Sequence, residues 1–185
     1  MKYFFLETRS EPGDPIAQKI AIPASHHEFD LGRKLPRLKK PIRVTVSKGK
    51  RPPTDLIQGP YTYIIASERL RTSFEELDPS NLDTAAVDLV CESRVIAKYY
   101  FIQTLNNIDA IDWSSSDLTS YPEDKYGIVE VRKLVLSPDA IGKRNVFRME
   151  GLVSDLVVSE KFRKRVLNAG MTGMRFVPTE DFKLS

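Results

Sequence analysis

The sequence has one cysteine, Cys91, and two histidines among its 185 residues. A single cysteine excludes an internal disulfide framework, which suits a reducing compartment. No apolar run approaches the roughly 20 residues that a membrane-spanning helix needs. The apolar stretch after Met1 is also too short for the core of a signal peptide. We therefore expect a cytoplasmic protein of ordinary globular composition, with 41% hydrophobic and 29% charged residues.

Motifs of the common enzyme classes are also missing. The sequence has no G-x-S-x-G nucleophile elbow, no phosphate-binding glycine-rich loop and no dinucleotide fingerprint. His26 and His27 are adjacent, so on a strand they would point in opposite directions and form a poor chelating pair. No Cys-x-x-Cys or His-x-x-x-His spacing supplies further ligands, so we expect no metal and no cofactor. Cys91 follows an apolar run and is expected to be a buried, inert thiol.

Two carboxylates, Asp109 and Asp112 in "NNIDAIDW", are the remaining candidates for catalysis. A carboxylate pair can act as acid and base if its surroundings separate the two pKa values, so a hydrolase is one hypothesis. Asp residues at strand ends more often bind their own backbone in turns, and we favour that structural interpretation. Trp113, the only tryptophan, is expected in the core or as a partly buried shelf beside them. The sequence therefore predicts a protein that is not an enzyme.

Charge is unevenly distributed along the chain. Leu31 to Thr54 contains nine Lys or Arg residues and no Asp or Glu, whereas the remainder has 19 basic and 25 acidic residues. A basic segment is thus attached to an acidic body, which the overall net charge of +3 conceals. The segment is one candidate for nucleic-acid binding. However, Leu31 to Pro60 has no aromatic residue to stack on bases, so a solvated basic loop is the favoured interpretation.

The pattern of apolar residues predicts an α+β fold, with a mostly antiparallel sheet and two principal helices packed on it. Residues 1–60 are expected to form an opening strand and then an irregular, basic, proline-rich extension, in which only "PIRVTVS" alternates like a strand. Residues 61–185 are expected to form the α+β core, and both regions to belong to one structural domain. "SPDAIG" predicts a single helical turn capped by Ser137.

A strand followed by a capped helix is predicted twice. Ser67 and Ser159, 92 residues apart, are expected N-caps, each followed by a glutamate in the first helical turn. Gly170 suits the left-handed position after a helix, and Gly173 suits a turn. The two similar stretches indicate either a duplication or a common local solution that arose twice. In either case, two amphipathic helices would cover one sheet.

Four stretches, in order along the chain, resemble a family of immunity proteins from bacterial polymorphic toxin systems, immunity family eleven. They are "YIIASERLRTSFEEL", "YYFIQTLNNIDAIDWSSSDL", "VRKLVLSPDAIGKRNVFRMEG" and "LVVSEKFRKRVLNAGMTGMRFVP". Together they cover about Tyr61 to Pro178, and Glu11 to Pro60 matches no part of the pattern. The resemblance implies no catalytic residues, because the similar positions are caps, turns and aromatic strands.

The resemblance implies an antidote that binds one cognate toxin protein and blocks it by stoichiometric occlusion, with no membrane and no small-molecule substrate involved. The alternative function is a nucleic-acid-binding module that uses the basic segment. Residues expected to contact a partner protein are cationic or aromatic, as is typical of interface anchors. They are Arg33, Arg37, Lys39, Lys40, Arg43 and Trp113.

Overall fold

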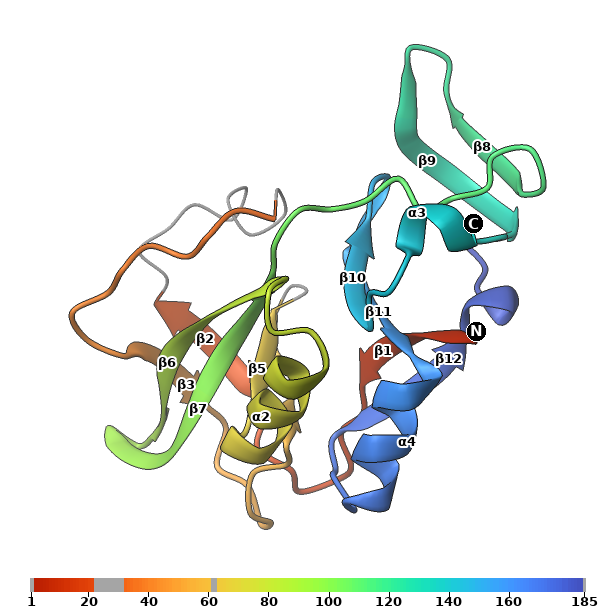
Figure 1. The fold of residues 1–185 in the computed structure, drawn as a ribbon. Helices are drawn as coiled ribbons and strands as arrows, with labels where there is room; N and C mark the ends of the chain where they lie inside the picture. The colour runs from red at the N-terminus through yellow and green to blue at the C-terminus, as the bar shows by residue number, and fades with distance from the viewer. Residues whose placement is uncertain (1, 22–31, 61–62, 185) are drawn as a thin grey trace.

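The computed structural model describes residues 2–21, 32–60 and 63–184, and Figure 1 shows their arrangement. The fold is α+β and its strand pairs are mostly antiparallel, as the sequence predicted. Among the named strands of the described residues, only β3 (Ile42–Val46) and β6 (Leu82–Cys91) pair in parallel. The prediction of one sheet was wrong, because the strands divide among a six-stranded, a four-stranded and a two-stranded sheet.

The four-stranded sheet has the order β10-β11-β1-β12. Its strands are β1 (Tyr3–Thr8), β10 (Val146–Met149), β11 (Leu152–Ser159) and β12 (Met174–Pro178). The first strand of the chain therefore lies between two strands from its end, antiparallel to both. Residues 3–6 are buried apolar side chains, so β1 is a continuous apolar run, as is typical of a strand covered on both faces.

The six-stranded sheet has the order β2-β3-β6-β7-β5-β4 and curls until its two edges meet. Its other strands are β2 (Ala17–Ala21), β4 (Leu56–Ile57), β5 (Ile64–Ala66) and β7 (Arg94–Thr104). At the closing edge, the N–H of Ala17 donates to the carbonyl of Gln58, at 2.8 Å. The curled sheet encloses a core to which every one of its strands contributes, including Val44, Ile57, Leu89 and Phe101.

The N-terminal region is more regular than the sequence predicted. Residues 11–60 supply β2, β3 and β4 to the six-stranded sheet, and only β3 was predicted. β3 is recognisable because Ile42, Val44 and Val46 are buried and alternate with exposed residues. β2 and β4 are not recognisable from the sequence. β2 lacks a regular alternation of buried and exposed residues, and β4 has only two residues. Both depend on pairing with distant strands.

Helices α2 (Glu68–Leu77) and α4 (Glu160–Asn168) begin at the predicted serine caps. The Ser67 hydroxyl accepts the N–H of Leu70 at 3.3 Å, and the Ser159 hydroxyl accepts the N–H of Phe162 at 3.2 Å. Each bond satisfies one of the free backbone donors at a helix start. The predicted single turn is α3 (Pro138–Ile141), with Ser137 as its cap.

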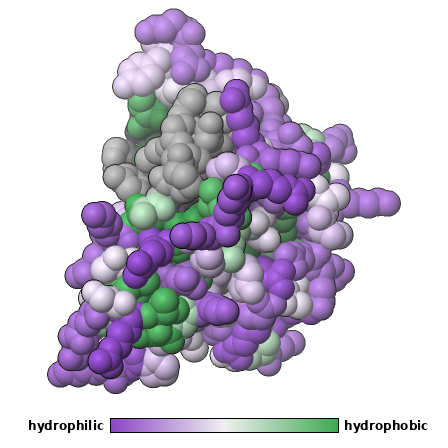
Figure 2. Space-filling model, turned by 90° about the vertical axis from the view of Figure 1, so that its left-hand side faces the viewer, coloured by the Kyte–Doolittle hydropathy of each residue, from purple (hydrophilic) through white to green (hydrophobic). Residues whose placement is uncertain are grey.

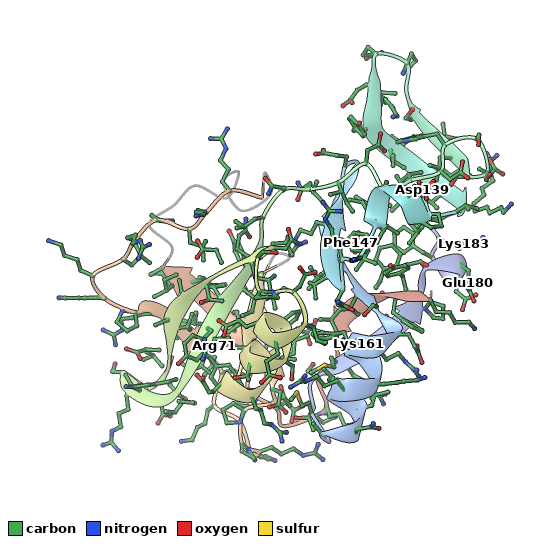
Figure 3. The ribbon with its side chains drawn as sticks, viewed as in Figure 1. Arg71, Asp139, Phe147, Lys161, Glu180 and Lys183 are labelled. Carbon is green, nitrogen blue, oxygen red and sulfur yellow. The ribbon has the colours of Figure 1, made fainter. Side chains whose placement is uncertain are left out.

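The two helices do not cover one sheet, contrary to the prediction. α2 follows β5 of the six-stranded sheet, α4 follows β11 of the four-stranded sheet, and the helices pack against each other, side by side in Figure 1. The rings of Phe74 and Phe162 lie 4.6 Å apart at this contact. Arg71, labelled in Figure 3, ties α2 back to β7, because its guanidinium lies 4.5 Å from the ring centre of Tyr100.

The two strand–helix stretches belong to larger units of identical topology. The first unit comprises β4, β5, α2, β6 and β7, and the second comprises β10, β11, α4, β12 and β1. Their strand orders are β4-β5-β7-β6 and β10-β11-β1-β12, with every neighbouring pair antiparallel. In both units the helix joins the second strand of this order to the fourth.

Strand register also matches between the units. Ile102 of β7 pairs with Ile64 and Thr84, and Leu6 of β1 pairs with Leu156 and Phe176. The constant separation of 92 residues therefore continues from β5 and β11 through the helices to β6 and β12. The matching strands β7 and β1 contain YYFIQT at 99–104 and YFFLET at 3–8. The likeness thus extends well beyond a local strand–helix motif, with β1 displaced to the start of the chain.

Two segments lie outside these units. Residues 9–54 contain β2 and β3, and residues 105–144 contain α3 and the hairpin of β8 (Asp117–Tyr121) and β9 (Asp124–Lys133). Figure 1 shows this hairpin projecting from the rest of the molecule. Its base is fixed by a third core that includes Val131, Leu134 and Ile141. After β12, the described residues form a 3-10 turn, η1 (Thr179–Asp181), and reach Leu184, which pairs with Val131.

Candidate interaction surfaces

The predicted cationic residues lie around the six-stranded sheet. Arg33, Arg37, Lys39 and Lys40 are exposed on the segment that leads into β3, and Arg43 points outward from β3. Leu35 and Leu38 of the same segment pack against the core of this sheet, which fixes the segment on the protein. Figure 2 shows that this side of the molecule is dominated by hydrophilic side chains.

The charge of the basic segment is partly neutralised. Lys48 pairs with Glu92 at 3.1 Å, and Arg51 pairs with Glu11 at 2.7 Å. Arg43 is in register with Asp88 on the neighbouring strand. Within the described part of the chain, no ion pair involves the five cationic residues predicted to bind a partner. They form a cationic patch, defined by Arg33, Arg37, Lys39, Lys40 and Arg43.

Trp113 lies in a different part of the molecule from the cationic patch. It packs against the third core, beside the β8–β9 hairpin, and is partly buried as predicted. Its indole N–H donates to Oδ1 of Asp109 at 2.9 Å. The structure therefore does not bring the six predicted residues together into one surface.

Asp109 is the centre of a cluster that sequence reasoning missed. Besides Trp113, its carboxylate accepts hydrogen bonds from Lys125 Nζ at 2.8 Å and the Tyr126 hydroxyl at 3.1 Å. Lys125 Nζ lies 4.7 Å from the centre of the Trp113 ring and 5.1 Å from that of Tyr126. The two rings meet edge to face at 6.1 Å. This Asp109 cluster joins β9 to the segment before β8.

The electrostatics of the Asp109 cluster favour an ion pair between Asp109 and Lys125. Burial disfavours the charged form of Asp109, but hydrogen bonds from Lys125, Trp113 and Tyr126 outweigh it and lower the pKa of the carboxyl group. The hydrogen bond with Asp109 raises the pKa of Lys125. Burial, followed by the hydrogen bond to Asp109, raises the pKa of Tyr126. Around neutral pH, Asp109 is therefore negatively charged, Lys125 is positively charged and Tyr126 is neutral.

Asp112 has the structural role that the sequence favoured. Its Oδ1 accepts the hydroxyl of Ser114 at 2.7 Å and the N–H groups of Ser114 and Ser115, both at 3.1 Å. These bonds close a turn and lower the pKa of Asp112. Asp109 and Asp112 thus shift in the same direction, whereas acid and base roles need their pKa values to separate. Their environment does not favour the hydrolase hypothesis.

The hairpin next to the Asp109 cluster exposes apolar side chains. Tyr121 is 58% exposed, Tyr126 39% and Val129 38%. The Tyr121 ring lies over Gly127, where a Cβ atom would come within 2.8 Å of Cδ2 of the ring. We call Trp113, Tyr121, Lys125, Tyr126 and Val129 the hairpin surface. Sequence reasoning found only its tryptophan, because β8 was not predicted.

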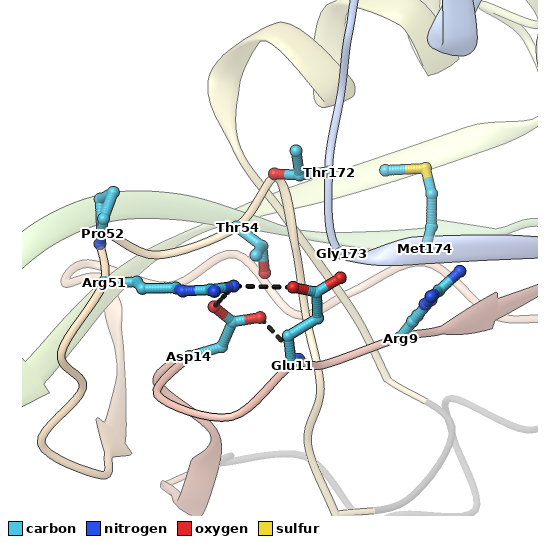
Figure 4. A pocket seen from close by; sticks show the side chains of 9 residues that line it. All are labelled: Arg9, Glu11, Asp14, Arg51, Pro52, Thr54, Thr172, Gly173 and Met174. Carbon is cyan, nitrogen blue, oxygen red and sulfur yellow. Dashed lines mark hydrogen bonds and ion pairs between the residues drawn. The ribbon is translucent and has the colours of Figure 1, made fainter.

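A cavity of about 430 Å³ opens between the connection of β1 to β2, the segment before β4 and the turn after α4 (Figure 4). Arg51 crosses its wall, 2.7 Å from Glu11 and 4.0 Å from Asp14, and the N–H of Glu11 donates to Asp14 at 2.8 Å. The bond to Glu11 raises the pKa of Arg51. These charges bind one another and connect two loops, so the cavity has a structural explanation.

A smaller cavity, of about 270 Å³, lies between the two units and is lined by residues that include Tyr63, Leu6 and Asp155. Burial raises the pKa of Asp155, and the hydroxyl of Ser154 donates to it at 3.1 Å. In the described ranges, no group of three or more His, Cys, Asp or Glu side chains is placed to hold a metal ion. None of the helices described is long and apolar enough to cross a membrane.

Two other predictions concern single residues. Cys91 is half-buried at the end of β6 and packs against the core of the six-stranded sheet, so it is less buried than predicted. His26 and His27 lie outside the described residues.

We compared the chain with known protein families. The model of the Immunity protein family (Imm11) matches residues 6–181. A comparison with curated proteins finds no match. The family match includes the N-terminal region that the sequence motifs left unassigned, and it spans both units and both segments outside them. The chain therefore belongs to the Immunity protein family (Imm11).

Proposed function

We propose that the protein binds one cognate bacterial toxin domain and neutralises it by stoichiometric occlusion, without turnover. The observation that carries this proposal is the family match over residues 6–181. The geometry is compatible with it, because the acidic groups considered for catalysis are engaged in structural bonds. Asp109 holds three donors, and Asp112 closes a turn.

The molecule is large enough for this role. A stable complex buries about 1,600 Å² in total, or about 800 Å² on each partner. The accessible surface of the chain is 10226 Å², so such an interface needs less than a tenth of it. Occlusion therefore requires only a small part of the surface of the chain.

The test uses the toxin domain encoded beside this protein in its source genome. The two proteins are co-expressed, and we expect cell survival and a one-to-one complex in size-exclusion chromatography with light scattering. In titrations with purified toxin, inhibition should be complete at one equivalent of immunity protein. A lack of association at micromolar concentration would contradict the proposal for that pair. Complete inactivation by a small fraction of an equivalent, with a covalently altered toxin, would contradict occlusion.

A further inference from the structure

We propose that the hairpin surface is the part of the molecule that contacts the toxin, and that it receives a face of the toxin rich in lysine and arginine. The inference rests on the proposed function and adds to it a surface and the charge of the partner. Four observations support it, and each is independent of the family match.

The first observation is exposed apolar area on a projecting element. Tyr121 and Val129 are 58% and 38% exposed on a two-stranded hairpin that stands away from both units (Figure 1). Interface anchors are often aromatic, and an anchor on a projection can enter a concave partner surface. The hairpin does not need these side chains for its own attachment, because its inward-facing Leu118, Ile128 and Val131 pack on the third core.

The second observation is rigidity before binding. The Asp109 carboxylate fixes Trp113, Lys125 and Tyr126 with three hydrogen bonds, and Lys125 lies over both aromatic rings. Rings that are already held in place lose little conformational freedom on binding, which favours affinity. Trp113 also packs against the third core, so the Asp109 cluster is anchored at the base of the hairpin.

The third observation is charge. Residues 109–133 contain six carboxylates and three cationic side chains. Two of these cations are already ion-paired, Lys125 with Asp109 of the segment before β8 and Arg132 with Glu130 of β9. Glu123 stands exposed in the turn between the strands. The surface is therefore acidic around its aromatic side chains, and the complementary partner is a basic protein face.

The fourth observation is position relative to the two units. The strands and helices of these units share their order and register, as expected for a scaffold that forms the core. Residues 105–144 lie outside this scaffold, between β7 and β10, and residues 9–54 occupy the matching place between β1 and β4. The cationic patch also lies outside the units, but the rings of the hairpin surface supply apolar anchors that the patch lacks.

The experiment measures the dissociation constant for the toxin domain encoded beside this protein. The double variant Tyr121→Ala/Val129→Ala removes exposed apolar contacts, and Glu123→Lys reverses a charge without touching the core. We expect each to weaken binding at least about tenfold, the range of interface hot spots. For Glu123→Lys the loss should shrink as salt is added, because salt screens exposed charges. The fluorescence of Trp113, the only tryptophan, shows whether the Asp109 cluster is intact in each variant.

Matched controls come from the other projecting hairpin. Val95 and Ile96, 52% and 46% exposed near the turn between β6 and β7, are replaced by alanine, and Glu92 by lysine. These variants should bind within about twofold of the wild type. If the wild type binds the toxin and the hairpin variants bind equally well, the hairpin inference is wrong while the proposed function stands. If the wild type does not bind, the proposed function itself fails. Loss of binding in the control variants alone would also overturn the inference.

Discussion

Asp55 and Asn145 occupy equivalent positions in the two units. The Ser67 hydroxyl donates to Oδ1 of Asp55 at 2.7 Å, and the Ser159 hydroxyl donates to Oδ1 of Asn145 at 2.8 Å. The backbone N–H of each serine also donates to the carbonyl of the same residue, at 2.7 and 2.8 Å. Each N-cap serine is therefore held by one Asx residue just before the neighbouring strand, which fixes the start of the helix on its sheet.

The same two residues connect the units to each other. Thr172, after α4, donates its N–H to Oδ2 of Asp55 at 2.9 Å. Asn145 donates through Nδ2 to the carbonyl of Leu77, the last residue of α2, also at 2.9 Å. The end of each helix is thus bound at the start of the other unit. Disturbing either position should weaken both units together.

Replacing Asp55 by alanine should destabilise the protein by about 2–4 kcal/mol, because several groups lose a buried charged acceptor. Asp55 is 6% exposed and also forms two bonds with Arg69, at 2.6 and 2.7 Å. The free energy of unfolding is measured by urea denaturation.

The second unit supplies a matched control for this change. There, Asn145 takes the place of Asp55, and Lys161, in the first turn of α4 (Figure 3), takes the place of Arg69. Asp55→Asn leaves Arg69 without its carboxylate, whereas Asp55→Asn with Arg69→Lys reproduces the second pair. The double variant should be more stable than the sum of the single effects predicts. Strictly additive losses would contradict the equivalence of the two positions.

Two glycines in the turn after α4 should differ in their tolerance of alanine. Both have positive φ, +59° at Gly170 and +88° at Gly173. A Cβ at Gly170 meets nothing within 4 Å, so Gly170→Ala should destabilise by about 1 kcal/mol through backbone strain alone. A Cβ at Gly173 would overlap the carbonyl oxygen of Leu56 and approach Thr54 Oγ1 to 2.6 Å. Gly173→Ala should therefore be several kcal/mol worse in thermal denaturation. Equal melting temperatures for the two variants would contradict the close approach of Gly173 to the carbonyl oxygen of Leu56.

Stability should respond to pH through Asp155. Its pKa is raised by burial, so the folded state holds this proton more tightly than the unfolded state. Stability therefore falls as the pH rises from the unfolded value, about 3.9, through the raised folded value. Asp155→Asn should be more stable than the wild type at pH 7, and this advantage should disappear near pH 3. Denaturation midpoints across this range test the sign, and a variant less stable at every pH would contradict it.

Asp55 should change the pH dependence of stability in the opposite direction, so that stability falls as the pH is lowered. Burial disfavours its charged form, but bonds from Arg69, Ser67 and Thr172 outweigh it and lower the pKa. The stabilisation is present above the unfolded pKa and is lost as the pH falls through the folded value. Asp55→Asn should therefore flatten the loss of stability below about pH 4. If the variant and the wild type lose stability equally as the pH falls, other carboxylates determine the acid sensitivity.

The sequence predicted features that depend on near neighbours. Ser67, Ser159 and Ser137 are recognisable as caps because the groups they bind follow within three residues. β3 is recognisable from its alternation, and Gly170 from its place after a helix. These features need no information about distant parts of the chain.

Features built by distant pairing were missed. The separation into three sheets depends on which strands pair, and the residues of β1 pair with residues 150 or more positions away. The Asp109 cluster joins a segment before β8 to the start of β9, so it required the hairpin to be known first. The equivalence of β7 and β1 was hidden because β1 lies at the opposite end of its unit in the sequence. Only the fold brings these strands into matching places.

The cationic patch should bind nucleic acid weakly and without sequence preference. Its five cations can contact up to about five phosphates, so the logarithm of the binding constant should fall with the logarithm of salt with a slope of about −4 to −5. The basic segment has no aromatic side chain to stack on bases, so affinity should vanish near 150 mM salt.

The measurement is a salt series with a 20-base-pair duplex. Neutralising all five cations with glutamine should abolish the binding that remains at low salt. Neutralising the ion-paired Lys48 and Arg51 is the matched control and should change it less. Tight, sequence-dependent binding that persists at 150 mM would instead make nucleic acid a functional partner. The absence of any binding at low salt would show that the patch does not act as a phosphate-binding surface.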